Sequence, residues 1–137
     1  MSAIYADASA LVKLVAGESQ TEALETYVGD AELLSSELAL AEVPRALRRI
    51  VSEEPGAALR PLLQRAEELL DEVTMAPVES ILLEAAGAIE ETRLRTLDAI
   101  HVITALYLEP IEAFVTYDVR QAASARLVGL RTVAPGL

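Results

Sequence analysis

The stretch IYADASALVKLV, residues 4–15, joins a short apolar segment to a longer one whose apolar residues recur at helical spacing. This pattern predicts a strand at residues 3–7 and a helix that begins directly after Asp7. A carboxylate between two apolar segments costs free energy unless water, a hydrogen-bond donor or a cation compensates its charge. Asp7 therefore indicates either a helix cap or a functional group at a strand end, and Ser9 could cap the helix instead.

The rest of the chain repeats this alternation of short apolar runs and amphipathic segments. Four further strands are predicted, at 31–34, within VTMAPV (73–78), at 112–117 and within LRTVAP (130–135). Strands that alternate with helices predict an α/β fold with a parallel sheet and helices on both faces. In such sheets ligands bind beyond the carboxyl ends of the strands, which is where Asp7 and Asp118 are expected.

Residue types at the expected helix ends refine this prediction. Hydroxyl side chains suited to capping precede three of the helical patterns, namely Thr21, Ser35 or Ser36, and Thr96. Apolar stripes at 59–70 and 78–89 predict two more helices, whose apolar faces could serve the core or an interface.

Composition restricts the class of protein. The 137 residues fit one domain, 1–137, and 53% of them are hydrophobic, which supports a substantial core. The absence of cysteine excludes disulfides and thiolate metal sites, and it suits a reducing cytoplasm. Because no basic leader precedes the first apolar run and no run is long enough to span a membrane, we expect a cytoplasmic protein without membrane contact.

Four acids stand among apolar residues. Besides Asp7 these are Glu42 in LALAEVPRAL, Asp98 in LRTLDAIHVITAL and Asp118 after FVTY. Each alone has a simpler explanation, because Asp7 and Asp118 could cap helices, Asp98 could favour a helix dipole, and Glu42 could pair with Arg45. Together they predict one metal site, and ligands that are all oxygen favour Mg²⁺ or Mn²⁺.

A carboxylate-bound divalent ion supports phosphodiester hydrolysis, because it activates a water and stabilises charge on phosphoryl and leaving oxygens. A metal-free ribonuclease would need a paired acid and base, and the chain has one histidine. We expect that residue, His101, to pack in the core or behind the site. A haloacid-dehalogenase phosphatase is excluded because Ser9 stands where its second aspartate is needed, and neither a receiver-domain acidic pair nor a glycine-rich phosphate loop is present.

The segments YADASALVKL, LALAEVPRALRR, LRTLDAIHVITAL and FVTYDVRQAASA resemble the PIN domain, and specifically the VapC-type toxins of bacterial toxin–antitoxin pairs. This resemblance implies a three-layer α/β/α sandwich and an Mg²⁺- or Mn²⁺-dependent endoribonuclease that uses a metal-activated water. It further implies that Asp7 and Asp98 bind the metal, that Glu42 and Asp118 do so directly or through water, and that Ser9 and Thr116 support them.

The resemblance also implies a homodimer and a small cognate antitoxin whose tail occupies the site. A net charge of −11 argues against nucleic-acid binding, but several bases lie near the four acids in the sequence. We expect RNA contacts from five of them, Lys13, Arg45, Arg48, Arg49 and Arg95. Two alternatives stay open, a PIN nuclease that processes RNA without being a toxin and an inactive domain that binds a protein partner.

Overall fold

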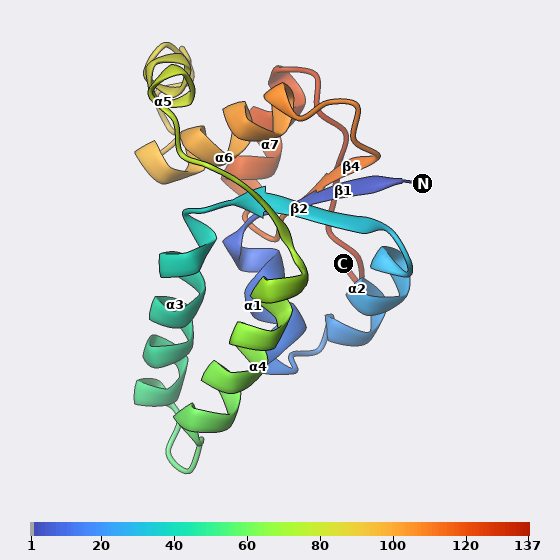
Figure 1. Cartoon of the computed structure of the whole chain (residues 1–137), viewed down its shortest axis with the longest axis vertical. Helices are drawn as coiled ribbons and strands as arrows, with labels where there is room; N and C mark the ends of the chain where they lie inside the picture. The colour runs from blue at the N-terminus through green and yellow to red at the C-terminus, as the bar shows by residue number, and fades with distance from the viewer. Residues whose placement is uncertain (1) are drawn as a thin grey trace.

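The computed structural model describes residues 2–137 and contains a five-stranded parallel sheet between two layers of helices (Figure 1). The strand order is β3-β2-β1-β4-β5, and neighbouring strands are parallel throughout. The strands are β1 (Ala3–Ala6), β2 (Glu32–Ser36), β3 (Thr74–Ala76), β4 (Ala113–Val115) and β5 (Thr132–Val133). All five predicted strands and the α/β/α layering are therefore confirmed.

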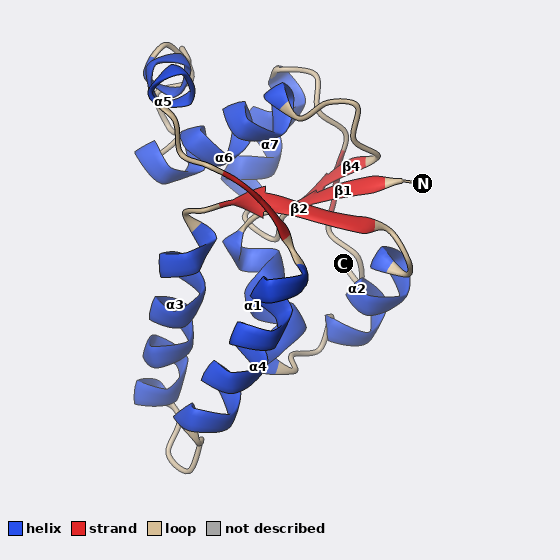
Figure 2. Cartoon of the chain, viewed as in Figure 1, coloured by secondary structure: helices blue, strands red, loops and turns tan. Residues whose placement is uncertain are grey.

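Within the described residues, seven helices cover the two faces of the sheet (Figure 2). One layer contains α1 (Ala8–Ala16), α2 (Thr21–Val28), α3 (Ala39–Glu53) and α4 (Leu59–Glu72). The other contains α6 (Thr96–Tyr107) and α7 (Val119–Leu127), with α5 (Ser80–Gly87) packed against α6. The apolar stripe of α4 faces α1 and α3, so most of the predicted stripe at 59–70 serves the core.

The central strand β1 connects two cores. Ile4 and Ala6 belong to the cluster beneath α1, α3 and α4, whereas Tyr5 belongs to the cluster with Val102 and Phe114 on the other face. This alternation follows from the two-residue period of a strand. Since both faces of β1 are buried, its residues are apolar without the polar alternation of an exposed strand.

The predicted caps at Ser35 and Ser36 are wrong, because both residues belong to β2. They pair with Met75 and Ala76 of β3, and α3 begins only at Ala39. The Ser35 hydroxyl donates to the Ala6 carbonyl at 2.7 Å, so it connects β2 to β1 instead of capping the start of α3. Pairing of parallel strands has overridden the local capping preference.

Thr21 and Thr96 are the first residues of α2 and α6 and not their caps. Neither helix has a side-chain cap hydrogen bond at its N-cap residue. The Thr21 hydroxyl donates to the Lys13 carbonyl at 2.7 Å, which joins the start of α2 to α1. Here a contact between two helices replaces the predicted contact within one.

The strand order reverses beside β1, because the chain moves from β1 to β2 and β3 on one side and then to β4 and β5 on the other. Such a point forms a crevice at the carboxyl ends of the strands. Asp7 directly follows β1, and Thr116 directly follows β4. Within residues 2–137, no helix combines the length and the apolar character that a membrane crossing requires.

Candidate active site

Asp7 lies at the carboxyl end of β1 and is 3% exposed. Its Oδ1 accepts hydrogen bonds from the Ser9 hydroxyl at 2.6 Å and the Ala10 amide at 3.0 Å, and its Oδ2 accepts one from the Thr116 hydroxyl at 2.6 Å. Asp7 is therefore itself the N-cap of α1, and the expectation that Ser9 could replace it there is wrong. Burial raises the pKa of the Asp7 carboxyl, and these hydrogen bonds offset part of that rise.

Ser9 and Thr116 also connect Asp7 to the segment after β4. The Ser9 hydroxyl oxygen accepts from the Tyr117 amide at 3.0 Å, and that of Thr116 accepts from the Asp118 amide at 3.1 Å. Each hydroxyl therefore donates to the buried carboxylate and accepts from the neighbouring loop. This arrangement fixes Asp7 relative to the second strand end.

Replacing Thr116 with valine should lower the free energy of unfolding by roughly 1–3 kcal/mol at neutral pH. The change removes a donor to a buried carboxylate, so the pKa of Asp7, already raised by burial, should rise further. A raised pKa in the folded state means that stability falls as the pH increases and Asp7 ionises. Urea unfolding should therefore show a loss that grows as the pH rises from the ordinary carboxyl pKa of about 3.9 towards neutral.

Thr104→Val provides the matched control for this prediction. Thr104 is buried in α6, and its hydroxyl donates to the Ile100 carbonyl without contacting an ionisable group. Its effect on unfolding should be nearly independent of pH. An equal pH dependence in both variants would contradict the role assigned to Thr116.

Asp98 lies half-buried in the first turn of α6. Burial raises the pKa of its carboxyl, and the carboxylates of Asp118 and Asp7 raise it further, while Arg95 and His101 act in the opposite direction. Asp118 caps α7 and accepts from the Arg120 and Gln121 amides at 2.9 and 3.1 Å. Three acids from separate elements thus contribute to one region of negative potential.

Glu42, in the first turn of α3, takes a different partner from the one its sequence suggested. Its Oε1 lies 2.7 Å from Nε2 of His101, and within residues 2–137 it forms no ion pair with Arg45. His101 is 1% exposed and lies behind Glu42, as predicted. On the other side of the ring, Nδ1 lies 2.7 Å from the Tyr5 hydroxyl.

Two polar residues of this site, Tyr5 and Gln121, were not predicted from the sequence. Tyr5 precedes Asp7 by two residues, and its hydroxyl was the available signal in an otherwise apolar strand. Gln121 is buried in α7, where its Nε2 donates to the Asp98 carbonyl at 3.2 Å and its Oε1 lies 3.4 Å from the Thr116 hydroxyl. Its signal was a lone amide three residues after Asp118 in an alanine-rich helix.

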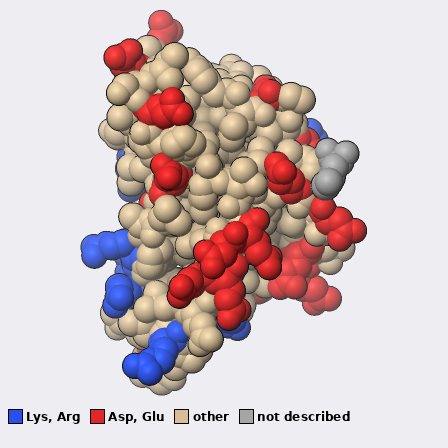
Figure 3. Space-filling model, viewed as in Figure 1, with Lys and Arg blue, Asp and Glu red and all other residues tan. Residues whose placement is uncertain are grey.

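A groove of about 640 Å³ runs between α1 and α3, beside Glu42. Apolar side chains such as Val12 and Leu97 line it. Its charged lining residues are Arg45, Arg49, Glu18 and Glu42. In the view of Figure 3, basic side chains gather along the α3 side of the molecule, whereas acidic ones cover α4 and α2. The groove therefore combines an apolar floor with positive charge at one wall.

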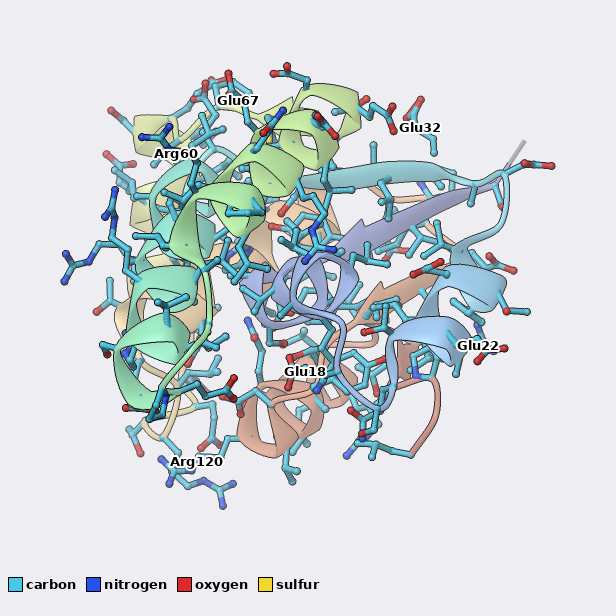
Figure 4. All side chains as sticks on the ribbon, turned by 90° about the horizontal axis from the view of Figure 1, so that it is seen from below. Glu18, Glu22, Glu32, Arg60, Glu67 and Arg120 are labelled. Carbon is cyan, nitrogen blue, oxygen red and sulfur yellow. The ribbon has the colours of Figure 1, made fainter. Side chains whose placement is uncertain are left out.

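The remaining predicted basic contacts differ in availability. Lys13 is half-buried, pairs with Glu18 at 3.4 Å and lies 4.7 Å from the centre of the Tyr117 ring. Figure 4 shows Glu18 beside α1, the helix that carries Lys13, and Arg120 at the periphery, extending outward. Arg48 and Arg95 are exposed. Arg45 and Arg49 are thus the bases that border the groove itself.

The chemistry of the four acids fits a hard divalent cation, since all their ligand atoms are oxygen and a buried, charged Asp7 needs neutralisation. The four acids lie in one region of the protein but do not all meet at one point, as a single metal site would require. The carboxylates of Asp118 and Asp7 raise the pKa of Asp98, but no three acidic or histidine side chains among residues 2–137 stand close enough together to enclose an ion. Glu42 approaches from α3 and is held by His101.

Comparisons with known proteins identify the family of the chain. A family model described as PIN domain matches residues 4–127. Ribonuclease VapC46 of Mycobacterium tuberculosis is 39% identical over 98% of this chain and 99% of its own length. Ribonuclease VapC47 of the same species is 35% identical over 97% of each chain.

Solved structures share the fold. Mycobacterium tuberculosis VapC20, described as a sarcin-ricin loop cleaving toxin, has a TM-score of 0.71 at 21% identity over 96% of this chain and 99% of that one. A toxin–antitoxin complex from Klebsiella pneumoniae has a TM-score of 0.61 at 22% identity over 89% and 91%. The predicted resemblance is thus confirmed, and the chain belongs to the PIN domain family, in its VapC ribonuclease branch.

Proposed function

We propose that the chain is an endoribonuclease, the toxin of a VapBC-type toxin–antitoxin pair, and that residues 1–137 form one nuclease domain. The names of the relatives support ribonuclease activity. The observation that carries the proposal is the buried Asp7 carboxylate, which two hydroxyls hold at the point where the strand order reverses. A buried carboxylate whose pKa is raised by its surroundings is characteristic of a functional site.

VapC nucleases of the PIN family generally depend on a divalent metal, and we propose Mg²⁺ or Mn²⁺ for this chain. Asp7 and Asp98 would bind it directly, and Glu42 and Asp118 would bind it directly or through water. When bound, such an ion lowers the pKa of a water molecule and stabilises charge on the phosphoryl oxygens. The chain's own part is to hold Asp7 rigidly through Ser9 and Thr116 and to keep the acids partly desolvated.

Arg45 and Arg49 would hold the RNA backbone along the groove, with Arg48, Arg95 and Lys13 further out. Guanidinium groups bind phosphate in a bidentate manner, and the apolar floor offers a surface for bases or riboses. Because the chain carries a net charge of −11, local positive charge is needed to bring a polyanion to the acids.

Replacing Arg45 and Arg49 by glutamine should weaken RNA binding and reduce its salt dependence. Each lost phosphate contact should lower the slope of log affinity against log salt by about 0.7 for single-stranded RNA. Binding is measured by fluorescence anisotropy at several salt concentrations, with Ca²⁺ replacing the catalytic metal. Arg65→Gln, an exposed arginine on α4, is the control and should leave the slope unchanged. Equal slopes in all variants would place the RNA elsewhere.

We further propose a cytoplasmic protein that forms a homodimer and is inhibited by a small antitoxin. The structural relationship to a toxin–antitoxin complex supports such a partner. A neighbouring gene for a small DNA-binding protein would favour a toxin over a PIN nuclease with a role in RNA processing.

The test of the proposed function is cleavage of RNA by the purified chain with Mg²⁺ or Mn²⁺, followed by mapping of the 5′ ends produced. Variants at Asp7 and Asp98 are compared with the intact chain. Cleavage that depends on both carboxylates supports the proposed site. A chain that binds a partner protein but never cleaves RNA would instead be the inactive domain.

A further inference from the structure

We propose that Tyr5 and His101 are positioning residues that hold Glu42 in its working orientation through two consecutive hydrogen bonds, the first of them buried. This inference rests on the proposed assignment of Glu42 to the active site. The Tyr5 hydroxyl lies 2.7 Å from Nδ1 of His101, and Nε2 of the same ring lies 2.7 Å from Oε1 of Glu42. These two hydrogen bonds connect β1 to α6 and α6 to α3.

The proposed role of Glu42 sets the direction of these hydrogen bonds. A carboxylate that binds a metal accepts hydrogen bonds and donates none, so in that role Glu42 requires a proton on Nε2 of His101. In a neutral imidazole Nδ1 is then an acceptor, and the Tyr5 hydroxyl is a donor that satisfies it. The Tyr5 bond therefore selects the ring tautomer that Glu42 requires.

The anchor of these two hydrogen bonds is rigid. The Tyr5 ring lies in the central strand and is stacked on Phe114, with centroids 5.3 Å apart and planes 7° from parallel. His101 meets the Tyr5 ring edge-on, with centroids 5.9 Å apart at 73°. Among residues 2–137, no buried side-chain polar atom lacks a hydrogen-bond partner. Rotation of the Tyr5 or His101 ring would break the hydrogen bonds it makes and leave buried polar atoms without partners.

The hydrogen bond from His101 fixes the orientation of the Glu42 side chain. A free glutamate side chain at a groove wall samples several rotamers, and fixing it in one of them costs conformational entropy. Its Oε1 is bound by His101, while Oε2 has no donor among residues 2–137 and is available at the groove. One oxygen therefore fixes the carboxylate and the other is left for a ligand or a water.

The first test observes the ring directly and needs neither metal nor RNA. His101 is the single histidine of the chain, so its ¹⁵N ring resonances are assigned without ambiguity. We expect a proton on Nε2 in the intact chain, and Glu42→Gln and Tyr5→Phe should each shift these resonances. A ring protonated on Nδ1 alone, or resonances unmoved by both variants, would overturn the proposal.

The second test separates positioning from packing. His101→Gln keeps an amide donor near the position of Nε2, whereas His101→Leu keeps bulk without any donor. We expect His101→Leu to weaken both Mn²⁺ binding, measured by calorimetry without RNA, and cleavage by about 10–100-fold. His101→Gln should retain most of the Mn²⁺ affinity and most of the cleavage activity. Thr104→Val, which removes a buried hydrogen bond on the same helix, should change neither.

Two results would contradict a positioning role for His101. In the first, His101→Gln and His101→Leu lose Mn²⁺ affinity and RNA cleavage to the same extent. In the second, His101→Leu binds Mn²⁺ and cleaves RNA like the intact chain. Should the leucine variant fail to fold, Tyr5→Phe serves in its place, and a smaller loss of Mn²⁺ affinity is expected because the donor to Glu42 remains. Failure of the proposed function has a different signature, in which Asp7→Asn cleaves RNA as well as the intact chain does while the ring still shows a proton on Nε2.

Discussion

Replacing Asp7 by asparagine is expected to reduce RNA cleavage by roughly 10²–10³-fold or more, without reducing stability. The loss follows because an amide is a far weaker ligand for a hard cation than a carboxylate and brings no negative charge. The measurement is the initial rate of cleavage with saturating metal, together with urea unfolding of the same samples at neutral pH.

The effect on stability follows from the pKa of Asp7. Burial raises this pKa in the folded state, so ionisation of Asp7 lowers stability as the pH increases towards neutral. Asparagine removes that charge. Its amide nitrogen can face the Thr116 hydroxyl, which can then donate to Oε1 of Gln121 instead of to Asp7. The variant should therefore be at least as stable as the intact chain at neutral pH.

Asp71→Asn is the control, because Asp71 is an exposed acid on α4, remote from the groove. It should leave both cleavage and unfolding unchanged. If Asp7→Asn lost activity only in proportion to a loss of folded protein, Asp7 would be a structural cap of α1 and nothing more.

The sequence predicted the sheet well because the signals that define it are local. Short apolar runs separated by amphipathic segments indicated all five strands, and the order of the four acids indicated the family. The caps at Ser35 and Ser36 were wrong because β3 pairs with those residues, and that pairing joins segments about 40 positions apart in the sequence. A local preference of about 1 kcal/mol is easily outweighed by a strand ladder.

The site was predicted less completely, because its contacts join segments that are far apart in the sequence. For Glu42 the sequence offered a partner three residues away as the alternative to a metal. The structure instead supplies His101, 59 residues away, which is itself bound to Tyr5 at a separation of 96. Helical spacing reveals neighbours on one helix and says nothing of contacts between α3, α6 and β1. Only the adjacency of these elements makes Tyr5 and Gln121 part of the site.

Removing divalent metal with a chelator is expected to abolish cleavage, and adding Mg²⁺ or Mn²⁺ should raise the unfolding temperature. A ligand that binds only the folded state at 100 times its dissociation constant stabilises by about 2.7 kcal/mol. For a chain of this size that corresponds to a shift on the order of 10 °C. The rise is expected because the carboxylates of Asp118 and Asp7 disfavour the charge on Asp98 until a cation neutralises it.

Asp98→Asn should lose most of this metal-induced shift, whereas Asp71→Asn should retain it. The shift should also shrink as the pH falls, because protons compete with the metal for carboxyls whose pKa values are already raised, those of Asp7 and Asp98. Differential scanning fluorimetry over a series of pH values measures both effects. A metal-induced shift of equal size in Asp98→Asn and in the intact chain would mean that the ion binds away from these acids, and the carboxylates would then need another explanation for their burial.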